Sequence, residues 1–341
     1  MSRRTKSRRT AATSTAAPAS PASTSTAASA STADSAATAA PADSAWPAAV
    51  SPRRPCPCGS GRRYKSCHGA GDVPVARPFE GLAGECDWIA LRELVPSATA
   101  PLRLAGEHPA REVLLATVLP LALPAIVRSD GRVLLGLQVH ARSGDVSRDL
   151  AHALQRALEA EPGTMLSAGG LPGPGPRLQD LLDPAEPVRP ELHDDFGFWL
   201  QDDADRTAEV QASLERANTA VVPTTRLTGV DAAYWTRIGD RAHLRWVMPQ
   251  DEDPLLDALA RLGAAGELAL GPGTRYAGSF RAHGRLVPVW DLPVDEPAER
   301  WEEPAADFGR RLAAALADRG PLTDAERRAR DGLRGRQLTL R

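Results

Sequence analysis

Lysine is almost absent from this chain. Of its 341 residues only Lys6 and Lys65 are lysine, so 39 of the 41 basic residues are arginine. A P-loop requires the sequence G-x-x-x-x-G-K-[ST], because its lysine reaches the β- and γ-phosphates, and neither lysine here follows a glycine. The motifs H-E-x-x-H, G-x-S-x-G and G-x-G-x-x-G are missing as well. These absences exclude a P-loop motor ATPase and leave no nucleoside-triphosphate site to assign.

Long apolar runs are also missing. The longest, residues 113–127, has 15 residues and contains Pro120 and Pro124, whereas a membrane span needs about 20 apolar residues. We interpret this run as buried strands and expect no membrane span. No apolar core of about 7–15 residues follows the N-terminal arginines, so we expect no secretory signal. Together with the free thiols, these features predict a cytoplasmic protein.

Cysteine is scarce, but three of the four cysteines lie within twelve residues. Cys56, Cys58 and Cys67, with His68 directly after them, give the spacing C-x-C, eight residues, then C-H. Three thiolates and one imidazole form a complete tetrahedral ligand set for a structural zinc ion. The alternative is a disulfide, but Cys56 and Cys58 are too close in the chain to meet disulfide geometry comfortably. We therefore predict a zinc site.

Residues 55–68 read P-C-P-C-G-S-G-R-R-Y-K-S-C-H. This stretch resembles the SEC-C motif, a zinc-binding module at the tail of the SecA preprotein translocase and on many otherwise unrelated bacterial proteins. The resemblance implies a small Cys₃His knuckle over residues 53–70 that binds Zn²⁺ through Cys56, Cys58, Cys67 and His68. In SecA-type proteins the similar module contacts a secretion chaperone and ribosomes. The resemblance therefore implies a protein partner or the ribosome as the target of the module.

Charge is divided unevenly along the chain. Residues 1–70 hold ten Lys/Arg and two Asp/Glu, a net charge of +8, and residues 71–341 hold 31 and 41, a net charge of −10. Residues 1–52 are basic at the start and then rich in Ala, Ser, Thr and Pro. They lack the large apolar side chains that offset ordering entropy, so we predict a disordered tail. Any contact with a polyanion is expected at this basic front end.

Residues 71–341 have the composition of a globular protein and predict an α+β body. Apolar periodicity predicts helices over 85–95, 147–161, 208–217, 254–262, 305–317 and 324–333, and strands over 113–119, 133–140, 244–248, 275–282 and 285–292. Ser147 and Asp253 are predicted to cap the helices that they precede. Two turn dipeptides, Asp130-Gly131 and His283-Gly284, predict that the strands on either side of them form hairpins.

Both predicted hairpins are followed by a loop and an alanine-rich helix, around residues 113–161 and 268–318. One interpretation is a diverged internal duplication, with similar halves at 79–165 and 205–320. The other is that a hairpin followed by a helix is simply a common unit of α+β proteins. Both interpretations remain open at the level of sequence.

The body offers few candidate site residues. His193-Asp194-Asp195 could bind a metal or act in acid–base chemistry, but adjacent strand residues face opposite ways, so we expect an exposed loop or strand end. Cys86 is expected to be a buried free thiol, with a substitute zinc ligand as the alternative. The arginines of the C-terminal stretch alternate with acidic residues, as on a solvated helix face. We assign no catalytic and no cofactor-binding residue.

Three further segments carry a second resemblance: residues 79–85 (FEGLAGE), 227–235 (LTGVDAAYW) and 336–341 (RQLTLR). They resemble an uncharacterised family of high-GC Gram-positive bacteria whose members carry a SEC-C motif at the front. That resemblance implies an architecture and no activity. We expect a zinc-dependent interaction or adaptor protein that recruits a protein partner or the ribosome. The alternative is an enzyme with an unrecognised active site in residues 71–341.

Overall fold

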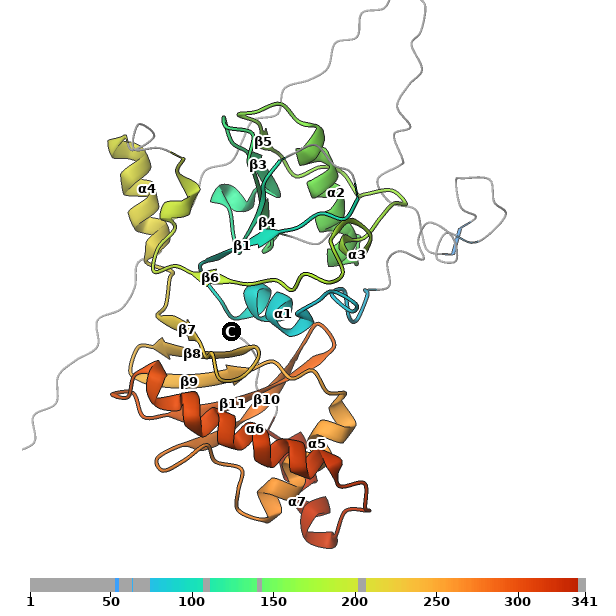
Figure 1. The fold of residues 1–341 in the computed structure, drawn as a ribbon, viewed down its shortest axis with the longest axis vertical. Coiled ribbons are helices and arrows are strands. Elements are labelled where there is room, and N and C mark those ends of the chain that lie inside the picture. The colour runs from blue at the N-terminus through green and yellow to red at the C-terminus, as the bar shows by residue number, and fades with distance from the viewer. Residues whose placement is uncertain are drawn as a thin grey trace, which may run out of the picture. The chain divides into compact units, whose positions relative to one another are not determined.

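The computed structural model describes residues 53, 54, 63, 74–106, 111–139, 143–201 and 207–336. The chain divides into two units, Met1–Ala49 and Val50–Arg341, and every described residue belongs to the second. Within the described residues, two sheets and seven α-helices form an α+β body, which confirms the predicted class (Figure 1). The predicted tail, residues 1–52, and the predicted zinc ligands lie outside the described residues.

The first sheet comes from the N-terminal part of the body. Its described strands are β1 (Ala98–Leu102), β2 (Val113–Ala116), β3 (Ala125–Val127), β4 (Val133–Gly136), β5 (Met165–Leu166) and β6 (Glu191–Leu192). They lie in the order β5-β3-β4-β2-β1-β6, and the β2–β4 pair is parallel whereas the others are antiparallel. The apolar run at 113–127 supplies β2 and β3, which confirms its interpretation as buried strands.

The predicted pairing around Asp130-Gly131 is wrong. The sequence predicts a hairpin between the strands at 113–119 and 133–140, but the hairpin partner of β4 is β3. β2 instead lies parallel to β4 on its other side. The 3₁₀ helix η3 (Pro120–Ala122) divides the apolar run, so the chain adds β3 before it turns at Gly131, where φ is +87°. The turn was recognisable from sequence, but the extra strand was not.

Three helices accompany this sheet: α1 (Glu85–Glu93), α2 (Val146–Glu159) and α3 (Leu178–Leu181). The predicted apolar stripe of α2 is confirmed, because Leu150, Leu154 and Leu158 are all buried. The predicted cap is wrong. Asp145 precedes the first turn, and its carboxylate accepts the backbone N–H of Ser147 at 3.0 Å. Since aspartate caps helices as well as serine does, α2 begins one residue before Ser147.

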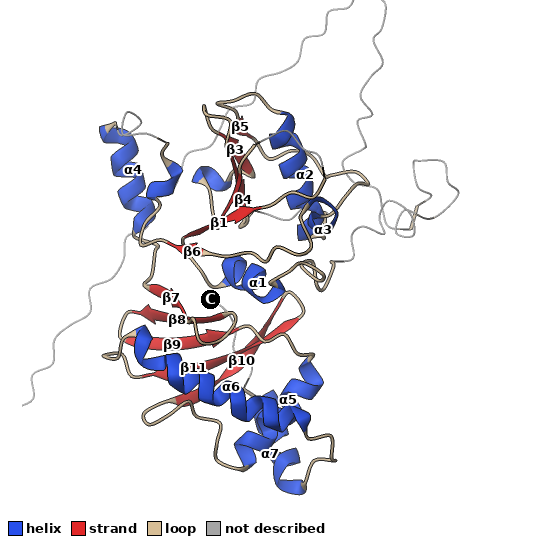
Figure 2. Ribbon diagram, in the orientation of Figure 1, coloured by secondary structure: helices blue, strands red, loops and turns tan. Residues whose placement is uncertain are grey.

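The second sheet contains β7 (Thr224–Arg226), β8 (Ala233–Ile238), β9 (Arg241–Trp246), β10 (Arg275–Ala282) and β11 (Arg285–Leu292). These described strands are ordered β10-β11-β9-β8-β7, and every neighbouring pair is antiparallel (Figure 2). The hairpin around His283-Gly284 is confirmed. Both turn residues have positive φ, +46° and +79°, as a two-residue type I′ turn requires. The strand predicted at 244–248 overlaps β9, and β8 was not predicted.

Of the remaining helices, α4 (Ala208–Asn218) precedes β7 in the chain, whereas α5 (Glu252–Ala264), α6 (Glu302–Ala317) and α7 (Asp324–Arg334) follow strands of this sheet. α6 packs on the sheet through Phe308, whose ring centroid lies 5.0 Å from that of Trp290 and 6.2 Å from that of Trp246. The predicted cap of α5 is wrong, because the helix begins at Glu252, before Asp253. No helix in the described part of the chain is long and apolar enough to cross a membrane.

A hairpin followed by a helix occurs three times in the described body. The three units are β3–β4–α2, β8–β9–α5 and β10–β11–α6. The two sheets also differ in topology, since the first contains the parallel β2–β4 pair and the second is antiparallel throughout its described strands. These observations favour the interpretation that the hairpin-plus-helix unit is a common building element rather than the mark of one duplication.

Candidate functional site

Four residues are predicted to bind zinc: Cys56, Cys58, Cys67 and His68. They lie outside the described residues, so the fit of a zinc ion rests on the chemistry of the donor set. Thiolate sulfur and imidazole nitrogen are the ligands that Zn²⁺ prefers, and four of them complete a tetrahedral structural site. Next to this set, the described side chains of Arg53, Arg54 and Arg63 are all exposed.

Cys86 is a free thiol, as predicted, and lies half-buried in α1. Burial, followed by the charge of Glu85, raises the pKa of the Cys86 thiol to about 12. A thiol must lose its proton to bind a metal or to attack an electrophile. The thiol of Cys86 therefore stays protonated at neutral pH in the absence of a metal. Among the described residues no group of three His, Cys, Asp or Glu side chains is placed to hold a metal ion.

The His193-Asp194-Asp195 segment does not assemble a site. His193 Nε2 lies 2.8 Å from Thr99 Oγ1, and its ring packs 5.1 Å from the ring of Phe198. Asp195 accepts the N–H of Gly197 at 2.7 Å, which closes a local turn, and Asp194 is exposed. His193 and Asp195 contact different neighbours, and the segment follows the end of β6, as the predicted exposed loop or strand end requires.

An open groove of about 560 Å³ lies between α2 and the glycine-rich loop that follows β5. Its polar lining comes from Asp149, His152 and Arg156, which share one face of α2. Burial, and then the nearby guanidinium groups of Arg148 and Arg156, lower the pKa of His152. Arg156 donates to the carbonyl of Ser167 at 3.2 Å, and the carboxylate of Asp149 accepts the N–H of Ser143. Two of the three polar groups thus hold loops in place.

Asp87 in α1 is one of the few buried charged residues in the described part of the chain, with 7% of its surface exposed. Its carboxylate accepts hydrogen bonds from Arg226 at 3.0 and 3.1 Å and from the Tyr234 hydroxyl at 2.7 Å. The bond to Asp87 raises the pKa of Arg226, and burial followed by the charge of Asp87 raises the pKa of Tyr234. Tyr234 is 1% exposed, so no substrate can reach it. The arrangement clamps α1 to β7 and β8.

This clamp was not predicted from sequence. Asp87 is separated from Arg226 by 139 residues and from Tyr234 by 147. An acidic residue in the first turn of a helix is ordinarily a surface residue that complements the helix dipole. The sequence held one indication that Asp87 is buried: it directly precedes Trp88, which belongs to the apolar face of α1 that packs on the core.

Two further acids of α1 pair with the second sheet and its flanking loops. Glu85 accepts from Arg77 at 3.0 and 2.8 Å and from Arg285 at 3.1 Å, and Arg285 is 9% exposed. Burial alone would raise the pKa of Glu85, but the hydrogen bonds from both arginines outweigh it and the net pKa is lowered. Glu93 lies 2.7 Å from Nε2 of His283 in the β10–β11 turn, and this bond lowers the pKa of Glu93.

Glu85→Gln is expected to remove an acid-sensitive part of the stability. Because the pKa of Glu85 in the folded protein lies below its ordinary value of 4.5, its ion pairs stabilise the fold fully above that pH. Their contribution is lost as the pH falls through the folded-state pKa. The free energy of unfolding measured with urea should therefore be higher for wild type than for Glu85→Gln at pH 7, and this difference should shrink as the pH falls below 4.5 and through the lowered pKa of Glu85. Glu80→Gln, which changes an exposed glutamate, is the control, and its free energy of unfolding should differ little from that of wild type at any pH. A difference in free energy of unfolding between wild type and Glu85→Gln that does not change with pH would contradict a stabilising role for the ion pairs of Glu85.

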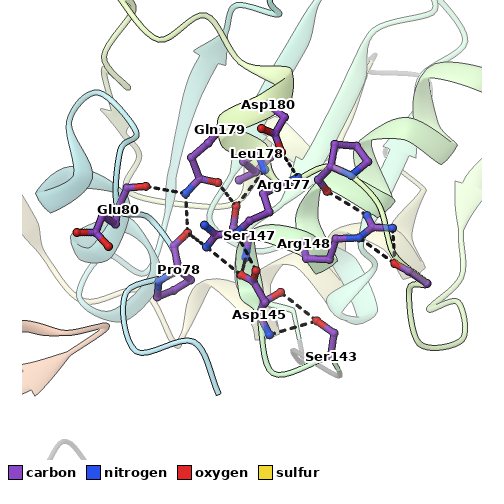
Figure 3. A network of polar contacts seen from close by, with 12 residues as sticks. Pro78, Glu80, Ser143, Asp145, Ser147, Arg148, Arg177, Leu178, Gln179 and Asp180 are labelled. Carbon is purple, nitrogen blue, oxygen red and sulfur yellow. Dashed lines mark hydrogen bonds and ion pairs between the residues drawn. The ribbon is translucent and has the colours of Figure 1, made fainter. Parts of the chain in front are cut away.

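A second polar network fixes the start of α2 (Figure 3). Asp145 accepts from Arg177 at 2.7 and 3.3 Å. The hydroxyl of Ser147 donates to Gln179 at 2.6 Å and accepts the N–H of Leu178 at 3.0 Å. Gln179 in turn donates to the carbonyl of Pro78 at 2.9 Å. Each of these groups has a partner within the network, which indicates a structural role for the residues drawn.

Comparison with known proteins gives two matches. A family described as a family of unknown function (DUF5926) matches residues 78–341. The SEC-C motif matches residues 55–70, the stretch that holds all four predicted zinc ligands. No curated protein and no solved structure matches the chain. Because the first match covers nearly all of the described body and most of the chain, the protein belongs to the DUF5926 family and carries a SEC-C motif ahead of the family domain.

Proposed function

We propose that the protein is a zinc-dependent interaction protein whose SEC-C module, residues 53–70, recruits a partner. The observation that carries the proposal is the SEC-C match at residues 55–70, a range that holds the four predicted zinc ligands, Cys56, Cys58, Cys67 and His68. SEC-C modules are commonly zinc-binding and act as interaction modules in other proteins. Zinc would hold the short loop in one conformation, because so small a segment has no apolar core of its own.

Charge supports a polyanionic partner such as the ribosome. The exposed Arg53, Arg54 and Arg63 lie on or beside the module, and residues 1–70 carry a net charge of +8 on a body of −10. A basic surface of this kind binds phosphate backbones through counterion release. The cytoplasm, where ribosomes are found, is the compartment that the free thiols favour.

The enzyme alternative has less support. Arg226 and Tyr234, whose pKa values are raised, both donate hydrogen bonds to Asp87, and Tyr234 is inaccessible. The groove beside α2 offers the imidazole of His152, with Asp149 and Arg156 engaged in loop contacts. Neither arrangement among the described residues pairs an accessible nucleophile with a base.

Ribosome co-sedimentation at two salt concentrations tests the proposal. If three to five arginine contacts neutralise phosphates, binding should weaken by roughly one to three orders of magnitude between about 50 and 200 mM salt. Pelleting should be lost in Cys67→Ser and in an Arg53/Arg62/Arg63→Ala triple variant. It should persist in a charge-matched control, Arg237/Arg319/Arg328→Ala, which removes three exposed arginines of the body.

The pattern of loss distinguishes the partners. Pelleting that resists salt, or that survives both module variants, would remove the module from ribosome binding. Absence of pelleting in wild type would turn the proposal toward a protein partner. In that case, affinity capture with the intact protein and the Cys67→Ser variant should recover proteins that depend on zinc.

A further inference from the structure

The edge strand β10 leaves one row of backbone groups open. β11 pairs with it on one side, and no described strand lies on the other. Backbone groups alternate in direction along a strand. Ser279 pairs with Pro288 of β11, which has no N–H to donate. Arg281 pairs with Leu286 of β11, whose carbonyl points to the opposite side of that strand and accepts the N–H of Met248 at 3.1 Å. The backbone groups of Ser279 and Arg281 therefore point outward, away from β11.

One of these outward groups already has a partner near the end of the chain. The N–H of Ser279 donates to the carbonyl of Arg336 at 3.2 Å. An antiparallel pair would also require the N–H of Arg336 to donate to Ser279. That N–H instead donates to the carbonyl of Leu333 at 3.1 Å, at the end of α7. The single hydrogen bond from Ser279 to Arg336 is instead the pattern of parallel pairing, in which the residues after Arg336 would run alongside β10 in the same direction.

We propose that residues 337–341 bind along the open edge of β10 as a parallel strand and close the second sheet. In this register the N–H of Leu338 donates to the carbonyl of Ser279, and the carbonyl of Leu338 accepts the N–H of Arg281. The N–H of Leu340 then donates to the carbonyl of Arg281. Five residues extend about 16 Å, which is enough to run beside the strand as far as its hairpin turn.

The side-chain pattern of the segment fits this register. The sequence Q-L-T-L-R alternates, and paired positions of neighbouring strands share a face. Leu338 and Leu340 fall on the face of Phe280 and Ala282, which are each 6% exposed and belong to the first apolar cluster. The polar residues between them fall on the face of Arg281, whose Nε bonds Glu252 at 2.6 Å. A slip by one residue would place both leucines on this charged face.

Two other observations favour residues 337–341 as the occupant of this edge. The family match extends to residue 341, so these residues belong to the family domain. Ser279 is 3% exposed although it lies in an edge strand. An open edge strand of eight residues is a template for unwanted pairing with other chains, and a five-residue strand from the same chain would cover most of it and leave a shorter edge.

Amide hydrogen exchange at Arg281 in the full-length protein tests the proposal. In wild type the Arg281 N–H should be protected, because it donates to Leu338. Leu338→Pro removes a ladder donor and should speed exchange at Arg281 at least about tenfold. Thr339→Pro is the matched control, since the Thr339 N–H faces away from β10 and an edge strand tolerates proline at such a position. The amide of Phe280, which faces β11, should exchange at the same rate in all three proteins.

Three results would overturn the proposal. One is an Arg281 amide in wild type that exchanges as fast as in a variant lacking residues 337–341. Another is equal protection in Leu338→Pro and Thr339→Pro. The third is protection that disappears on dilution together with a dimer seen by light scattering, which would place the C-terminal segment of a second copy on the edge.

Discussion

Metal analysis of the purified protein is expected to find about one zinc ion per chain, falling to near zero in Cys67→Ser. The reason is the ligand set: three thiolates and one imidazole complete a tetrahedral site, and structural zinc sites of this kind bind with apparent free energies of about 10–16 kcal/mol. A hydroxyl in place of one thiolate leaves an incomplete set with a much weaker ligand. The loss should be measured by inductively coupled plasma mass spectrometry after gel filtration.

The chain provides its own control for this experiment. Cys86→Ser makes the same chemical change at a thiol whose pKa is raised to about 12 by burial. It should leave the zinc content unchanged, because Cys86 lies in α1 and outside the predicted ligand set. Full zinc occupancy in a Cys56→Ser/Cys67→Ser double variant would contradict the assignment, and loss of zinc in Cys86→Ser would make Cys86 a ligand.

Treating the same samples with a chelator tests whether zinc stabilises the module alone or the body as well. If residues 53–70 fold around zinc independently, chelation should remove the metal and change the melting temperature of the body little. A ligand that binds only the native state stabilises that state. A large fall in the body's melting temperature would therefore show that zinc contributes to the body's own stability.

Features of this fold that depend on neighbouring residues were predictable from sequence. The turn at His283-Gly284 needs two residues with positive φ, and the strands on either side alternate, so the hairpin and its bounds could be predicted. The stripe of Leu150, Leu154 and Leu158 likewise predicted the buried face of α2. Helix starts were less certain, since several capping residues stand near the start of α2 and either aspartate or serine can serve.

Features that depend on distant pairing were not predictable. β6 has two residues, and it is a strand only because it pairs with β1. The parallel β2–β4 pair arises because η3 and β3 intervene, a topology that apolar periodicity does not encode. Most clearly, Asp87 resembles any acidic residue in a first helical turn. Its burial follows from Arg226 and Tyr234, which the fold brings to it from more than a hundred residues away.

Asp87→Ala is expected to destabilise the body by about 3–5 kcal/mol. Removing the carboxylate would leave the Arg226 guanidinium without its partner and the buried Tyr234 hydroxyl without an acceptor, and breaking a buried ion pair on one side costs about that much. Folded domains are stable by only about 5–15 kcal/mol, so the change is a large part of the total. Urea unfolding at pH 7 measures it, and Asp87→Asn, which keeps the shape and the hydrogen-bonding oxygen, gives a milder variant if Asp87→Ala does not fold.

A matched control and a double variant identify the cause of this loss. Glu80→Ala removes a carboxylate that also pairs with an arginine, Arg77 at 2.7 Å, but with 61% of its side chain exposed. It should cost no more than about 1 kcal/mol. Arg226→Met combined with Asp87→Ala removes both charges, so the double variant should be less destabilised than the sum of the singles by about 0.5–3 kcal/mol. If Asp87→Ala costs no more than Glu80→Ala, or the two changes simply add, then the contact between Asp87 and Arg226 does not hold α1 to the second sheet.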